Sequence, residues 1–136
     1  MLKRMVVVAG LVVAGIVATG VVTAGAVTSA RVVPVTLNEF NILPAMQAAP
    51  AGKVVFVLGN SGKKTHEFVV VMTVKPAGSL LKGNEADETG AVGEVGELKP
   101  GQTKKLTLTL KRGHYAVLCN LPGHYQAGQF ADFYVR

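Results

Sequence analysis

A series of short runs rich in valine, leucine and threonine, separated by glycine, proline and asparagine, limits what most of this chain can fold into. Runs of this kind are typical of β-strands that end in tight turns. Residues 103–111 alternate, with Leu106, Leu108 and Leu110 on one side and lysine or threonine on the other. That period of two predicts a strand with one face in water. The expected strands cover residues 32–37, 53–58, 68–74, 103–111, 115–119 and 130–135.

These strands predict an all-β fold of the sandwich or barrel type. Pro34 lies inside the run 32–37, and because proline cannot donate a ladder hydrogen bond, this strand is expected at a sheet edge. Residues 76–100 differ, since they are rich in glycine and hold most of the acidic residues. We interpret them as a long connection with a helical turn. No amphipathic helix of useful length is predicted in residues 31–136.

The first thirty residues are a separate unit. Lys3 and Arg4 are followed by no charge until Arg31, and residues 5–18 are entirely apolar or glycine. A basic start, an apolar run and a small-residue sequence such as AGA near its end are typical of an export signal. The charge-free stretch also exceeds the roughly 20 residues that span a bilayer, so an uncleaved membrane anchor is the rival interpretation. Under both interpretations, residues 31–136 lie outside the cytoplasm, for example in a periplasm.

The composition bounds the class of protein. Hydrophobic residues make up 49% and charged residues 16% of the 136 residues, which excludes an intrinsically disordered chain. The length fits one folded domain, residues 31–136, behind the signal or anchor of residues 1–30. The net charge of +6 includes no long run of like charges, so we expect no nucleic-acid partner. A single cysteine excludes an internal disulfide and any site with several thiolates.

The segment CNLPGHYQAGQ, residues 119–129, carries the chemistry of this chain. Cys119 ends a predicted strand, a Pro-Gly turn follows, and His124 comes next. A second histidine, His66, lies at the start of another predicted strand. One thiolate and two imidazoles at one end of a sandwich are the ligand set of a trigonal copper centre with a weak axial ligand. Copper would also occupy a thiol that an oxidising compartment otherwise endangers.

On these residues and two further motifs, the sequence resembles the cupredoxins, the small blue-copper proteins. The motif LKPGQ at residues 98–102 is like the family's turn before its penultimate strands, and GHY at residues 113–115 is like its G-x-Y before the copper cysteine. The resemblance covers most of the expected domain. It implies a Greek-key β-sandwich or barrel that holds one type 1 copper ion, with His66, Cys119 and His124 as the equatorial ligands.

The sequence departs from the commonest pattern of this family at Gln129, where many members have methionine. Stellacyanin-like members use a glutamine oxygen as the axial ligand, so the resemblance implies that Gln129 fills this position. A harder oxygen ligand favours Cu(II) over Cu(I), which predicts a lower reduction potential than in a methionine-ligated relative. Met46 and Met72 are possible substitutes, but they lie outside the ligand segment and are interpreted as packing residues.

The expected function is the transfer of single electrons between redox proteins that dock transiently near His124. No acid, base or activated nucleophile accompanies the site, so we expect no enzyme; a Cys119–His124 dyad for acyl transfer lacks an oxyanion arrangement. The remaining histidine, His114, is expected to be exposed and outside the site.

Two alternatives stay open at this point. The protein could store or deliver copper with the same ligands, although the chain lacks the Met- and His-rich tract that copper carriers often show. It could also bind zinc structurally, or no metal, and act as a structural module at the membrane. We expect a monomer, which associates with a membrane through residues 5–30 if this segment is retained.

Overall fold

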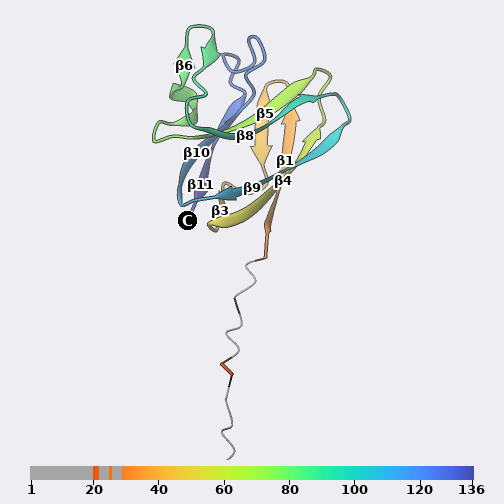
Figure 1. Cartoon of the computed structure of the whole chain (residues 1–136). Helices are drawn as coiled ribbons and strands as arrows, with labels where there is room; N and C mark the ends of the chain where they lie inside the picture. Colours follow the sequence, from red (N-terminus) through yellow and green to blue (C-terminus); the bar gives the residue numbers. More distant parts are fainter. Residues whose placement is uncertain (1–19, 22–24, 26–28) are drawn as a thin grey trace, which may run out of the picture.

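The structure is a computed structural model of the chain and describes residues 20, 21, 25 and 29–136. The described part is a sandwich of two β-sheets with a small hairpin and a short 3-10 helix (Figure 1). This architecture confirms the predicted all-β fold. The predicted N-terminal signal or anchor helix falls almost entirely outside the described residues. Within those residues, no helix is long and apolar enough to cross a membrane.

The first sheet has the strand order β2-β1-β4-β9. Its strands are β1 (Arg31–Asn38), β2 (Asn41–Pro44), β4 (Gly52–Asn60) and β9 (Thr103–Leu110). Strand β1 pairs in parallel with β4, whereas the β1–β2 and β4–β9 pairs are antiparallel. Alternate residues of β1, namely Val33, Val35 and Leu37, are buried, as a strand with one solvent-facing side requires.

The second sheet has the order β3-β11-β10-β5-β8. Its strands are β3 (Ala48–Ala49), β5 (His66–Met72), β8 (Ala91–Leu98), β10 (Gly113–Leu118) and β11 (Phe130–Val135). The antiparallel pairing of β5 with β10 sets Val69 opposite Leu118. The start of β5 therefore lies beside the end of β10, which brings together the two ends that carry His66 and Cys119.

The main apolar core fills the space between the two sheets. At its centre, Phe56 packs against Phe68 and against Phe133, with ring centroids 5.3 Å apart in both pairs. Aromatic pairs in such tilted arrangements each stabilise the fold by roughly 0.5–1.5 kcal/mol beyond the area they bury. This core fixes the sheet that supports the ends of β5 and β10.

A smaller core covers the outer face of the second sheet. It is closed by the helix η1 (Ala77–Ser79) and by the hairpin of β6 (Leu81–Lys82) and β7 (Glu85–Ala86). The Tyr125 hydroxyl holds the η1 segment against the sheet. It accepts a hydrogen bond from Leu80 N at 2.8 Å and donates one to Ala77 O at 2.6 Å. Burial on both faces explains why β5 and β10 are apolar at consecutive positions rather than alternating.

The prediction for residues 76–100 is wrong in part. The helical turn is present as η1, but the segment also contains the β6–β7 hairpin and all of β8, which pairs with β5. Strand β8 has the sequence AVGEVGEL, in which glycine and glutamate outnumber the β-branched residues that favour strands. Pairing with β5 overrides this weak local preference.

The prediction that Pro34 marks an edge strand is also wrong, because β1 lies between β2 and β4. The carbonyl of Pro34 accepts a hydrogen bond from Ala45 N at 2.8 Å, so its nitrogen faces β2 as well. The ladder between β1 and β2 ends at the pair Val35–Pro44. Pro34 therefore lies one residue beyond the end of this ladder, where no N–H is required from it.

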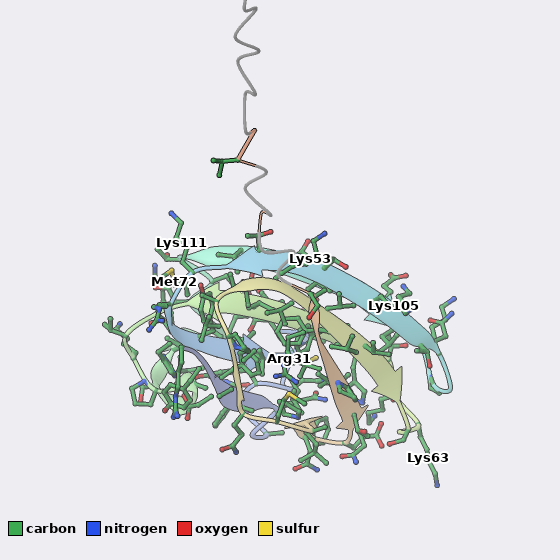
Figure 2. The ribbon with its side chains drawn as sticks, turned by 90° about the horizontal axis from the view of Figure 1, so that it is seen from below. Arg31, Lys53, Lys63, Met72, Lys105 and Lys111 are labelled. Atoms are coloured by element: carbon green, nitrogen blue, oxygen red, sulfur yellow. The ribbon has the colours of Figure 1, made fainter. Side chains whose placement is uncertain are left out.

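The end of the domain at which β1 begins is basic. Strands β1 and β4 start at this end and β9 finishes there, which gathers the exposed side chains of Arg31, Lys53 and Lys111 (Figure 2). Strand β10 also starts at this end and runs away from it. The chain thus enters the domain at the end opposite Cys119.

Candidate metal centre

The three side chains that the sequence predicts as equatorial ligands meet at one end of the sandwich. His66 is the first residue of β5, Cys119 follows the last residue of β10, and His124 lies in the loop between β10 and β11. A turn in this loop, in which His124 N donates to Leu121 O at 2.9 Å, directs His124 back toward the sheet. The candidate ligand atoms of the three residues all lie within 4.8 Å of one another.

The candidate ligand atoms face one another closely. The Nδ1 atoms of His66 and His124 are 3.3 Å apart, and Cys119 Sγ lies 3.4 Å from His124 Nδ1. His66 and Cys119 are fully buried, whereas His124 is partly exposed. Two imidazole nitrogens and one sulfur at these separations fit a single metal ion, and this donor set suits copper and is acceptable to zinc.

Cys119 is held as a buried thiol. Its Sγ accepts a hydrogen bond from Glu67 N at 3.3 Å. Burial raises the pKa of the Cys119 thiol above its ordinary value, and this N–H only partly offsets the rise. A cation that binds here must therefore displace the thiol proton, which makes metal binding dependent on pH.

His124 presents a neutral imidazole. Burial lowers the pKa of His124 below its ordinary value, and the neighbouring His66 lowers it further. The ring of Phe40 packs edge-on against that of His124, with centroids 5.0 Å apart. Because a neutral imidazole keeps one unprotonated nitrogen, His124 is in the form that a metal requires.

His66 is held from its other side by Glu39. Glu39 Oε1 lies 3.2 Å from His66 Nε2 and also accepts hydrogen bonds from Lys63 N at 2.8 Å and Lys64 N at 2.7 Å. The backbone N–H of Lys64 is the main cause that lowers the pKa of Glu39, so the carboxylate is ionised at neutral pH. An ionised carboxylate only accepts hydrogen bonds, so Glu39 places an acceptor, and not a donor, next to Nε2 of His66.

Gln129 also reaches the site. Its side chain is fully buried, and Nε2 donates to Asn38 O at 3.0 Å and to Asn41 O at 3.2 Å. Its Oε1 is buried without a hydrogen-bond partner among the described residues. Burying an oxygen without a hydrogen-bond partner destabilises the folded state by about 1–3 kcal/mol. Such atoms are rare in folded proteins, and a bound ion is one explanation for them. The Gln129 side chain lies beside His124, where it opposes the lowering of that pKa.

Two asparagines that the sequence does not single out shape the site. Asn60 Nδ2 donates to Lys64 O and to Leu98 O, both at 2.8 Å, and its Oδ1 accepts from Gly62 N. These bonds fix the loop that leads into β5. The Asn-Ser-Gly sequence could have indicated this role, because asparagine side chains commonly bond the backbone two residues on.

Asn120 fixes the other side of the site. Its backbone N donates to Glu67 Oε1 at 2.8 Å, and its side chain exchanges hydrogen bonds with the backbone of Ala86. The loop after Cys119 is thereby joined to β5 and to the β6–β7 hairpin. No local sequence signal marks Asn120, Glu67 or Glu39, because each acts on a residue far away in the sequence.

The remaining candidate residues lie elsewhere. The expectation that His114 is exposed is wrong: its side chain is only 16% exposed and is bonded to Thr73 and Asp132 at the start of β10. Met46 packs against the main core, as predicted. Met72 is 41% exposed at the end of β5 away from His66, so its interpretation as a packing residue is wrong.

A family model described as a cupredoxin-like domain matches residues 11–131 of this chain. No curated protein matches the sequence. Among solved structures, rusticyanin from Thiobacillus ferrooxidans is similar with a TM-score of 0.60 at 19% identity, over 79% of this chain and 77% of that chain.

Two auracyanins are similar as well. The dithionite-reduced auracyanin of the photosynthetic bacterium Roseiflexus castenholzii has a TM-score of 0.57 at 20% identity, over 79% of this chain and 96% of that chain. Auracyanin A, described as a "blue" copper protein of the green thermophilic photosynthetic bacterium Chloroflexus aurantiacus, has a TM-score of 0.59 at 18% identity. That match covers 79% of this chain and 100% of the other. At these identities, the likeness shows the shared fold.

Proposed function

Because this chain belongs to the cupredoxin-like family, we propose that it is a type 1 copper protein that carries single electrons between redox partners. The observation that carries the proposal is the cluster of His66, Cys119 and His124, whose candidate ligand atoms lie within 4.8 Å of one another. Copper held by one thiolate and two imidazoles supplies a one-electron couple between Cu(I) and Cu(II).

Gln129 is the weak axial ligand in this proposal. Its Oε1 is buried without a hydrogen-bond partner among the described residues, and a metal ion beside it would relieve the cost of that burial. Its Nε2 is anchored to the carbonyls of Asn38 and Asn41, which leaves Oε1 as the free end of the amide. The sequence resemblance assigns the same role to this residue.

The rigidity of the site favours electron transfer over copper delivery. His66 is paired with Leu98 within the second sheet, and Cys119 N donates to Gln129 O at 3.0 Å across the ligand loop. His66 and Cys119 have no exposed surface. A carrier that hands copper on needs ligands that open to solvent, whereas an electron carrier works best with ligands that stay in place in both oxidation states.

We place the docking surface for redox partners around His124. This is the one predicted equatorial ligand with exposed surface, and it lies beside the half-buried Leu121 and the exposed Pro122 and Ala127. A small surface of this kind suits a transient complex.

Residues 1–30 are assigned to export, as a cleaved signal or a retained anchor. Strand β1 runs from Arg31 to Asn38, and Asn38 O accepts a hydrogen bond from Gln129. Eight residues of strand separate the two ends by roughly 25 Å. An anchor that ends at Arg31 would therefore leave the metal centre facing away from the membrane. The domain is expected to be a monomer.

The test is copper addition to the metal-free chain. The wild type is compared with Cys119→Ser, which removes the thiolate, and with His114→Gln, which removes a histidine from the opposite end of β10. We expect an intense visible thiolate-to-copper band and a type 1 EPR signal in the wild type and in His114→Gln, and neither in Cys119→Ser. An ordinary Cu(II) spectrum in the wild type would contradict the proposal.

Further outcomes separate the alternatives. Rapid transfer of the bound copper to a competing chelator would favour copper delivery. Selective retention of zinc, with no redox-active copper form, would favour the structural module.

A further inference from the structure

Glu39 contacts the buried histidine of the metal centre from the side opposite the cluster. It follows β1, in the connection that leads to β2, and its Oε1 lies 3.2 Å from His66 Nε2. The His66 side chain has no exposed surface, whereas that of Glu39 is 26% exposed. The carboxylate thus separates the buried ring from solvent.

The Glu39 carboxylate is fixed by contacts that do not involve the ring. Lys63 N donates to Oε1 at 2.8 Å and Lys64 N donates to the same atom at 2.7 Å. Gly62 leaves the space that the carboxylate occupies, because a Cβ built there would lie 2.8 Å from Glu39 Cδ. Two backbone N–H groups and the space at Gly62 therefore fix the position of the carboxylate independently of its contact with His66.

The consequence for His66 follows from the chemistry of imidazole. A neutral ring carries one hydrogen, and a carboxylate draws it to the nitrogen that it faces. With the hydrogen on Nε2, the lone pair lies on Nδ1, which is 3.3 Å from His124 Nδ1 and faces the cluster. Carboxylates that bond the far nitrogen of a ligand histidine also increase the basicity of that ligand.

We propose that Glu39 is a positioning residue of the metal centre, which holds His66 in the tautomer that binds metal and lowers the reduction potential of the bound copper. The second part rests on the proposed function. A negative charge beside a ligand favours the more positively charged oxidised metal, and a more basic imidazole does the same. The exposed ammonium groups of Lys63 and Lys64 extend from the same loop and are screened by water, so they offset this charge only weakly.

The first experiment uses the metal-free full chain. Long-range proton–nitrogen NMR correlations report which nitrogen of His66 carries the hydrogen. The expected result is Nε2–H in the wild type and a mixture of tautomers in Glu39→Ala. Gly62→Ala, which displaces the carboxylate without removing it, should shift the mixture in the same direction. An Nδ1–H tautomer in the wild type, or no change in Glu39→Ala, would overturn the positioning role.

The second experiment uses the copper-loaded chain. Glu39→Gln keeps an oxygen that accepts hydrogen bonds but removes the charge, so we expect the visible band to persist and the reduction potential to rise. Glu39→Ala should raise the potential further and weaken metal binding by roughly 10- to 100-fold. The matched control is Glu97→Gln, which neutralises an exposed carboxylate next to Leu98, the β8 residue that pairs with His66. Equal potentials in Glu39→Gln and Glu97→Gln would overturn the proposed effect on copper.

The two experiments also separate this inference from the proposed function. If the wild type forms no type 1 copper site, the proposed function fails and the effect on copper fails with it. The tautomer measurement needs no metal, so it tests the positioning role in either case.

Discussion

Two histidine–carboxylate pairs lie at opposite ends of the second sheet, His66 with Glu39 and His114 with Asp132. In the second pair both ring nitrogens are occupied, because His114 Nδ1 lies 2.7 Å from Thr73 O and Nε2 lies 2.7 Å from Asp132 Oδ1. In the first pair only Nε2 meets its carboxylate, at 3.2 Å, and Nδ1 faces the cluster. A carboxylate partner alone therefore does not distinguish the two histidines. Only His66 of the two has a ring nitrogen that faces further candidate metal ligands, Cys119 and His124.

The largest difference between the two histidines is expected in copper binding. His66→Ala should abolish the type 1 spectrum, because it removes one of two imidazoles from a trigonal donor set. His114→Ala should leave the spectrum unchanged, since neither nitrogen of His114 is available to a metal. Visible absorption after addition of one equivalent of Cu(II) measures both effects. A lost band in His114→Ala together with a retained band in His66→Ala would reverse the comparison.

The next difference is expected in stability on metal binding. Zinc is used because it is not redox-active and does not oxidise the Cys119 thiol. At a hundredfold excess over Kd, it should raise the free energy of unfolding of the wild type by about 2.7 kcal/mol. Cys119→Ser should lose most of this gain because the thiolate is missing. His114→Ala should show the same gain as the wild type, measured from its own metal-free value. Chemical unfolding with and without zinc provides the comparison, and an equal gain in Cys119→Ser would contradict it.

A third difference between the two ends is expected in the reduction potential, because the unpartnered Oε1 of Gln129 lies at the His66 end. Gln129→Met should raise the reduction potential of the copper-loaded chain, since a thioether favours Cu(I) more than an amide oxygen does. The matched control is Gln126→Met, an exposed glutamine of the same loop. The two potentials are measured by redox titration of the visible band. A potential that is unchanged or lower in Gln129→Met would count against axial coordination.

The His114 end should respond in stability rather than in spectrum. Asp132 Oδ1 accepts from Ala77 N at 2.8 Å as well as contacting His114, so it joins η1 to the start of β10. Asp132→Ala should lower the free energy of unfolding by about 2 kcal/mol, because two donors lose a charged acceptor. Glu85→Ala, an exposed carboxylate of β7, is the control and should change little. A loss of the copper band in Asp132→Ala would contradict the division between the two ends.

The sequence predicted that His66, Cys119 and His124 lie together, and the fold shows why they do. Cys119 and His124 are joined by a short turn, so their proximity is local. His66 reaches them because it begins the strand that pairs with β10. The all-β class followed similarly from alternating and continuous apolar runs that the sheets then bury.

What the sequence could not provide depends on contacts between distant segments. Glu39 meets His66 only because β1 and β5 bring their ends together, and nothing in its local sequence marks it. The strand β8 forms although its glycines and glutamates disfavour strands, since β5 offers it a partner. Pro34 sits in a central strand because its nitrogen faces the point at which the β2 ladder stops.

The smallest expected effect is on stability and concerns Glu67, the residue after His66. No cationic side chain is among the described groups that shift the pKa of its carboxylate. Burial raises the pKa of Glu67 above its ordinary value of 4.5, and nearby Glu88 adds to the rise, while Asn120 N opposes it. The folded state therefore keeps the Glu67 proton to a higher pH than the unfolded state. This group favours folding below the ordinary pKa and loses that contribution as pH rises through the raised value.

Glu67→Gln removes the free-energy cost of burying an ionised carboxylate. It keeps an oxygen that can accept a hydrogen bond from Asn120 N. In the metal-free chain it should raise the free energy of unfolding at pH 7 by less than about 1 kcal/mol, because the side chain is only half-buried and water screens it. The gain should vanish near pH 3, well below the ordinary pKa, where Glu67 is protonated in both states. Chemical unfolding at the two pH values, with Glu97→Gln as the control, measures the difference. A gain that is the same at both pH values would show that the substitution acts through packing and not through the buried charge.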